Sequence, residues 1–200
     1  MSGPRRADRR AGARGQSLVE FSVSVPVFVM LLFGMLEFGF AFNHNLTLEY
    51  ATREGARTGA ALANGTVKIP CASVDNEIIA SVQRVLTSPG TPIDISRISS
   101  VRIYRAKTTD NSGDPDPTAI NTWIPGSDGT IVDGVTLIFR KSTVNWNACT
   151  RDNGSTPDSI GISLTYSYRL ISPLGIFLGM TGANPAFQMS DQTVMALNPS

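Results

Sequence analysis

The sequence predicts an α+β fold: a long N-terminal transmembrane helix that extends into a small exported domain with a second helix and an antiparallel sheet. The first observation is an apolar segment of 25 residues, 18–42, whose only charges are Glu20 and Glu37. The second is helical periodicity at 74–86, and the third is strand periodicity in the residues after it. Helices followed by strands are typical of a sheet packed on helices.

The apolar segment is long enough to cross a membrane. As an α-helix it spans about 37 Å, whereas the hydrocarbon core of a bilayer is ~30 Å thick. The apolar part of a secretory signal peptide is only about 7–15 residues long. We therefore expect a retained anchor, in which Pro26 kinks the helix or frees backbone groups locally.

Charge gives the expected orientation. Residues 1–14 hold five arginines and Asp8, a net charge of +4, and the whole chain carries +1, which leaves −3 for residues 15–200. Positive flanks stay cytoplasmic, so we expect a cytoplasmic N-terminus, an extracytoplasmic C-terminal domain and membrane lipid as a partner. The basic arm is short and no basic face follows it, which argues against nucleic acid as a partner.

The helix is predicted to continue beyond the membrane. Residues 46–63 contain no proline, and Asn64-Gly65 supplies a stop signal. One face of this part carries the small residues Ala51, Gly55 and Gly59, which let another helix or a sheet approach closely. The expected division of the chain is a basic cytoplasmic leader at 1–15, an N-terminal helix at 16–64 with its membrane part at about 18–42, and an extracytoplasmic α+β domain at 65–200.

The domain is predicted to hold a second helix and several strands. Apolar residues recur at helical spacing over Val74–Leu86, with Ser73 as a cap and Ser88-Pro89-Gly90 as a stop. Period-two alternation is clearest over 160–168. The other segments with an expected structure are strands at 101–104, 135–139 and 188–197, a long surface loop at 107–130, and a short helix or packed loop at 170–180.

Two cysteines, Cys71 and Cys149, lie beyond the anchor. An even count in an oxidising compartment suggests one disulfide, and the alternative is two buried free thiols. Two cysteines with one distant histidine do not make a metal site. That histidine, His44, is expected to be a solvated linker residue just outside the membrane. Because no catalytic constellation is evident, we expect no enzyme activity, no cofactor and no small-molecule substrate.

Glu20 and Gly15 form a processing signature. Gly15 ends the basic leader and lets extended backbone enter a peptidase site, and Glu20 lies five residues further on, inside the apolar segment. A carboxylate in a membrane segment is costly and usually has a function. Cleavage after Gly15 would leave Gln16 with a free amine, and Glu20 of one subunit could pair with that amine on a neighbour. The alternative is a signal anchor whose Glu20 lies passively among the headgroups.

This layout resembles the processing site of type IV pilin-like proteins. A narrower resemblance is carried by Arg14-Gly15-Gln16-Ser17-Leu18-Val19-Glu20-Phe21, Pro26, Gly34-Met35-Leu36-Glu37-Phe38-Gly39 and Ala51-Thr52-Arg53-Glu54-Gly55-Ala56-Arg57. Together these residues cover about residues 14–60, and they resemble the TadE-like family. Those proteins are minor pilins or pseudopilins of the tight-adherence, or Flp pilus, system.

The resemblance implies a pilin-like fold and a role in pilus assembly. It also implies cleavage by a prepilin peptidase, and an inner-membrane assembly platform and other pilins as partners. The leader could also be retained. On this view Gly15 and Gln16 form the processing site, and Glu20 and Phe21 serve assembly. The residues expected to pack the helix are Pro26, Gly34, Glu37, Gly39, Gly55, Arg57 and Gly59.

Some alternatives stay open at this point. Glu37 is either an interfacial carboxylate that reaches water or a polar contact with another anchor helix. The aspartates of the segment at 110–116 either stabilise turns of a surface loop or form a calcium-binding loop, although the segment lacks the spacing of an EF-hand. The whole protein could instead be a single-pass membrane-anchored binding or adhesion module outside any pilus, or an exported enzyme with a site that the sequence does not reveal.

Overall fold

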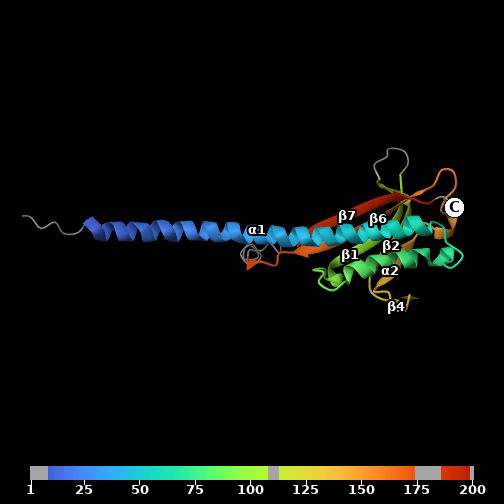
Figure 1. The fold of residues 1–200 in the computed structure, drawn as a ribbon, viewed down its shortest axis with the longest axis horizontal. Helices are drawn as coiled ribbons and strands as arrows, with labels where there is room; N and C mark the ends of the chain where they lie inside the picture. The colour runs from blue at the N-terminus through green and yellow to red at the C-terminus, as the bar shows by residue number, and fades with distance from the viewer. Residues whose placement is uncertain (1–8, 108–112, 174–185, 199–200) are drawn as a thin grey trace, which may run out of the picture. The chain divides into compact units, whose positions relative to one another are not determined.

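The computed structural model of the chain describes residues 9–107, 113–173 and 186–198, with side chains from residue 15 onward. The chain divides into two units: an anchor unit, Met1–Phe40 with Leu170–Pro185, and a domain unit, Ala41–Arg169 with Ala186–Ser200. Two helices and a five-stranded antiparallel sheet confirm the predicted α+β class (Figure 1). The predicted leader therefore lies mostly outside the described residues.

Helix α1 spans Arg9–Leu62 and runs through Pro26 without interruption. It ends close to the predicted stop. Ala63 has a φ of 47° and Gly65 a φ of 114°, a left-handed conformation that ends helices. A Cβ at Gly65 would also lie 2.8 Å from the backbone nitrogen of Cys71, so glycine is required at this turn for space as well as for conformation.

Helix α2 spans Val74–Leu86, with the bounds that the sequence predicted. Ser73 occupies the N-cap position, but its side chain makes no capping hydrogen bond there. A turn of 3-10 helix, Cys71–Ser73, leads into α2 instead. At the other end the hydroxyls of Thr87 and Ser88 donate to the carbonyls of Gln83 and Arg84, at 2.8 and 2.6 Å. Local side chains thus satisfy the last carbonyls of the helix.

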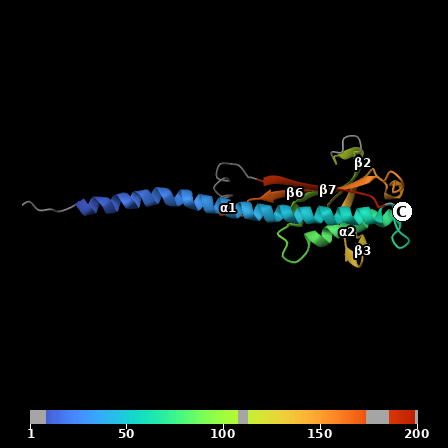
Figure 2. The ribbon, with the colours of Figure 1, turned by 45° about the horizontal axis from the view of Figure 1, so that its top comes forward.

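In the domain unit, α1 and α2 lie side by side on one face of the sheet (Figures 1 and 2). The small residues of α1 bring the layers together. A Cβ at Gly55 would lie 2.6 Å from Val82 on α2, and one at Gly59 would lie 2.7 Å from Ile160 on the sheet. The predicted close approach at these two glycines is therefore present within the chain itself, and it serves both a helix and a sheet.

All neighbouring strands of the sheet are antiparallel, in the order β5-β2-β1-β6-β7. These strands are β1 Ile98–Ala106, β2 Pro115–Pro125, β5 Phe139–Val144, β6 Ser159–Arg169 and β7 Ala186–Ala196. A two-stranded hairpin, β3 Ile131–Val132 with β4 Val135–Thr136, stands apart. Two further 3-10 turns are Ile95–Arg97 and Ala148–Thr150.

Strand β6 shows the period-two pattern that the sequence predicted. Its buried side chains on the helix side are Ile160, Ile162, Leu164, Tyr166 and Tyr168. The residues between them are glycine, serine and threonine. At about 1.5–3 kcal/mol for each fully buried large apolar side chain, this row is a main contributor to the stability of the domain.

The predicted loop at 107–130 is wrong at residues 115–125, because these residues form β2. Two prolines and several turn-forming residues at 113–118 obscure the strand in the sequence. These prolines are tolerated because β5 pairs only with residues 121–125 of β2, which leaves the proline-containing start with a single neighbouring strand. The buried side chains of Asn121 and Trp123 show where β2 enters the core.

The predicted strand at 135–139 is also wrong as one element, since the chain divides it between β4 and β5. Gln83 of α2 lies at the break. Its amide donates to the carbonyl of Thr136 at 3.1 Å and accepts from the backbone N–H of Ile138 at 2.9 Å. A side chain from a helix therefore takes up backbone groups that a continuous strand would pair with a neighbour.

Tyr104 lies on the sheet face opposite the helices. Its ring covers Gly161, where any Cβ would collide with it, and its hydroxyl donates to the carbonyl of Gly113 at 3.1 Å. Burial, with smaller contributions from the charges of Asp114 and Asp191, raises the pKa of Tyr104 to about 12.

This shift predicts a loss of stability at high pH. An unfolded tyrosine ionises near pH ~10. Between about pH 10 and 12 the unfolded chain therefore binds fewer protons than the folded chain, and stability falls as pH rises. A titration of phenolate absorbance should show one of the four tyrosines ionising last, and Tyr104→Phe should remove that step. Ionisation of all four tyrosines in a single step near pH ~10 would contradict the assignment.

Candidate assembly and processing site

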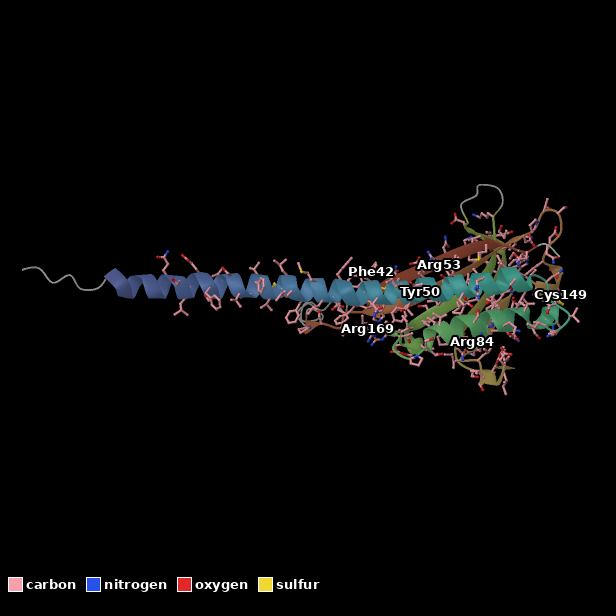
Figure 3. All side chains as sticks on the ribbon, in the orientation of Figure 1. Phe42, Tyr50, Arg53, Arg84, Cys149 and Arg169 are labelled. Atoms are coloured by element: carbon pink, nitrogen blue, oxygen red, sulfur yellow. A yellow bond between two sulfur atoms is a disulfide. The ribbon has the colours of Figure 1, made fainter. Side chains whose placement is uncertain are left out.

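The N-terminal part of α1 carries an exposed apolar surface. Within the described residues, one helix is long and apolar enough to cross a membrane. Figure 3 shows the side chains of this part projecting outward from the helix, and large ones such as Phe21, Met35 and Phe38 are about 70% exposed. A water-soluble protein would bury a helix of this composition, so the surface fits a membrane anchor.

The predicted processing and assembly residues, Gly15, Gln16, Glu20 and Phe21, lie on two consecutive turns of this helix. The amide nitrogen of Gln16 donates to a carboxylate oxygen of Glu20 at 3.0 Å. Cleavage after Gly15 would make Gln16 the N-terminal residue, and the side chain of Gln16 is therefore already in contact with the carboxylate of Glu20. Among the described residues, no atom of another segment lies within 4 Å of a Cβ placed on Gly15.

The bond that the sequence predicts to be cut lies inside a helix. Gly15 and Gln16 are both helical residues of α1, which begins at Arg9. A peptidase that takes an extended backbone would have to unwind this turn. Glycine lowers the cost of doing so by about 0.5–1 kcal/mol relative to alanine.

Polar side chains near Glu20 are satisfied within the helix. The hydroxyl of Ser22 donates to the carbonyl of Val19, and that of Ser24 donates to the carbonyl of Glu20, both at 2.8 Å. Such bonds keep serine acceptable in an apolar segment, where water is absent. The carboxylate of Glu20 is the chemically distinctive group of this turn.

The residues predicted to pack the helix fall into two groups. Gly55 and Gly59 contact other elements of their own domain unit, as described above. Gly34 and Gly39 have no other segment within 4 Å of a Cβ placed on them, so among the described residues the helix surface is open at these points. Arg57 is solvent-exposed in this chain and pairs with Glu54 at 3.4 Å, so its packing role stays a prediction.

Glu37 is not the interfacial carboxylate reaching water that one of the two alternatives predicted. It is buried within the anchor unit at 7% exposure. Its two carboxylate oxygens accept hydrogen bonds from the backbone N–H groups of Ile171 and Ser172, at 3.0 and 2.8 Å. The sequence offered no sign of this contact, because the partners are 134 and 135 residues away.

His44 is not the solvated linker residue that the sequence predicted. It is 4% exposed and lies against two tyrosines of β6, with ring centroids 5.7 Å from Tyr166 and 5.0 Å from Tyr168. The histidine thus belongs to the core of the domain unit. The reason is that α1 already lies on the sheet at this position, which the sequence placed in a linker.

Sequence reasoning missed a buried polar cluster. Asp75 at the start of α2 forms an ion pair with Arg151, whose guanidinium lies 4.3 Å from the centre of the Trp146 ring. Asn121 of β2 donates to Asp75 at 2.8 Å and accepts from the backbone N–H groups of Asn145 and Trp146. A disulfide joins Cys71 and Cys149 close by, which is the predicted pairing. The cluster joins α2 to the sheet, which is a structural role.

Part of the Asp-rich segment is described. Asp116 accepts from Arg105 at 2.7 Å and from the backbone and side chain of Thr118. The Arg105 guanidinium, followed by Thr118, holds the pKa of Asp116 below its usual range. In the described residues no group of three metal-binding side chains is present. Asp110, the third aspartate of the possible calcium loop besides Asp114 and Asp116, lies outside the described residues.

Comparison with known proteins identifies the N-terminal segment. A family model described as TadE-like protein matches residues 15–57. Residues 15–57 are a TadE-like domain. This confirms the resemblance over the segment that carries Gly15, Glu20, Gly34, Gly39 and Gly55. TadE-like proteins are associated with the Tad pilus and are generally not enzymes.

The TadE-like domain ends at Arg57, within α1, and the rest of the chain lies outside the match. Comparisons with curated proteins and with solved structures found no match. The sheet and α2 are therefore understood from their own geometry.

Proposed function

We propose that the protein is a membrane-anchored minor pilin or pseudopilin that contributes to assembly of a Flp-type, tight-adherence pilus. The observation that carries this proposal is the position of the TadE-like match on the apolar, exposed part of α1. A surface of this kind is suited to contact lipid and other anchor helices. Gly34 and Gly39 are the points at which a neighbouring helix can approach most closely.

The proposed orientation places the N-terminus in the cytoplasm and the domain outside. The net charge of +4 in residues 1–14 supports it, since positive flanks remain on the cytoplasmic side. The disulfide between Cys71 and Cys149 supports it independently, because disulfides persist in oxidising compartments. In this arrangement the leader is 1–15, the N-terminal helix 16–64 crosses the membrane at about 18–42, and 65–200 form the exported domain.

The proposed partners are a prepilin peptidase, the inner-membrane assembly platform and other pilins. Deleting the gene from a piliated cell should reduce surface pili, and supplying the wild-type chain should restore them. Pulldown of the wild-type chain should recover the assembly platform. Normal piliation without the gene, together with a membrane-inserted chain that recovers no platform, would favour the alternative of a single-pass binding or adhesion module.

Cleavage between Gly15 and Gln16 is a separate expectation. The basic leader, the glycine and Glu20 at mature position five support it. Intact-mass analysis of membrane-extracted protein should show the loss of residues 1–15, which leaves 185 of the 200 residues. If Met1 or Ser2 is the sole N-terminus in cells with an active prepilin peptidase, the leader is retained.

A further inference from the structure

The contact between Glu37 and the segment after β6 is not used by the proposed function. Glu37 lies in the apolar segment 18–42, five residues before its end at Phe42, which is about 7.5 Å along the helix. Ile171 and Ser172 donate their backbone N–H groups to its carboxylate. These two residues therefore lie at the same depth as Glu37 relative to the anchor.

The side chains around this contact are apolar and exposed. Ile171 is 57% exposed, and on the helix the neighbours of Glu37, Leu36 and Phe38, are 54% and 72% exposed. The sequence from Leu170 to Met180 contains no charged residue. The exposed surface at Ile171 thus continues the surface of the helix that is expected to meet lipid.

The hydrogen bonds from Ile171 and Ser172 to Glu37 satisfy polar groups that would otherwise have no partner at membrane depth. Backbone outside a helix is tolerated at membrane depth only where protein groups satisfy its N–H and C=O groups, because water is absent there. A carboxylate is equally unfavourable at that depth without partners. The bonds from Ile171 and Ser172 satisfy both needs at once, which gives a reason for an acidic residue near the outer end of the apolar segment.

We propose that Ile171 and Ser172, which follow β6, form a second membrane contact, in which Glu37 is the positioning residue that holds their backbone and Ile171 meets lipid acyl chains. This inference rests on the proposed anchoring role of α1. It assigns Glu37 to contacts within its own chain, whereas Glu20 is assigned to assembly.

Depth-dependent fluorescence quenching tests the proposal on the full chain in vesicles of phosphatidylethanolamine and phosphatidylglycerol. The two native cysteines are joined, so a cysteine-reactive environment-sensitive dye can be placed at Ile171→Cys. Leu36→Cys is the reference for the anchor. Ile131→Cys, an isoleucine 65% exposed on the β3–β4 hairpin, is the matched reference for the domain.

Nitroxides on the acyl chains should quench the dye at position 171 about as strongly as the dye at position 36. Iodide, which stays in the water, should quench the dyes at 171 and 36 less strongly than the dye at 131. If iodide quenches the dye at 171 as strongly as the dye at 131 but does not reach the dye at 36, the inference is overturned and the anchor proposal stands. If iodide also quenches the dye at 36, the anchor proposal is overturned as well. Protection of 171 from both quenchers shows a protein contact there and rejects lipid as the occupant.

The role of Glu37 has its own variants. Glu37→Leu should cause loss of acyl-chain quenching at 171, and Glu37→Gln should retain part of it, since its amide oxygen still accepts one N–H. Glu54→Leu removes a half-buried glutamate that lies in the domain part of the same helix, and it should change nothing at 171. Unchanged quenching in Glu37→Leu would overturn the positioning role.

Discussion

Replacing Glu20 with leucine should leave the protein inserted in the membrane and remove it from the pilus assembly complex. If Glu20 pairs with the N-terminal amine of a neighbour, Glu20→Leu leaves that cation unpaired in the membrane. The cost on insertion scales is about 2.5–3.5 kcal/mol, which corresponds to a roughly 100-fold shift in an association equilibrium. Cleavage should continue, because the peptidase depends mainly on Gly15.

The measurement is co-purification of wild type and Glu20→Leu with the assembly platform or the pilus fraction, at matched expression. The contact between Gln16 and Glu20 supplies a control. Gln16→Ala removes the side-chain hydrogen bond but keeps an N-terminal amine after cleavage. It should assemble normally if the amine is the partner of Glu20.

Three outcomes separate the explanations. Loss in Glu20→Leu with recovery in Gln16→Ala supports pairing between subunits. Equal loss in both variants points to the bond within the helix instead. Equal recovery of wild type and Glu20→Leu would leave Glu20 as a passive residue among the headgroups.

Removing the disulfide should cause the largest loss of stability in the domain unit. Cys71 and Cys149 are 78 residues apart in the sequence, and a loop of that length contributes about 4–5 kcal/mol in the chain-entropy model. The buried pair of Asp75 and Arg151 lies beside the two turns that hold the cysteines, and Figure 3 shows Cys149 at the end of the domain where α1 stops. Loosening these turns would also weaken that pair.

The variant is the double substitution Cys71→Ser and Cys149→Ser, followed by urea unfolding of the full chain in detergent. Its midpoint should fall well below that of the wild type, and it should not respond to a reducing agent, whereas the wild type should. Alkylation of unreduced, denatured wild type should label neither cysteine. Labelling of both cysteines, or equal midpoints, would show that the domain depends on packing alone.

The sequence by itself determined the elements whose signal is local. The apolar run of α1 and the helical spacing of α2 are properties of consecutive residues, and α2 appears at the predicted bounds. In β6, large apolar or aromatic residues alternate with small ones, and this local pattern likewise indicates a strand with one buried face. The TadE-like match likewise depends on a continuous segment, so the residues of that segment alone indicate the candidate site at Gly15, Gln16 and Glu20.

Only the tertiary structure decided the features that depend on distant partners. β2 is a strand because β1 and β5 pair with it, despite the prolines at its start. β4 and β5 are separate because Gln83 of α2 bonds to the backbone between them. His44 is buried because two tyrosines of β6 receive it, and Glu37 is buried because backbone N–H groups more than 130 residues away donate to it. A buried polar group is stable only with a partner, and a one-dimensional pattern does not show which partner the fold brings to it.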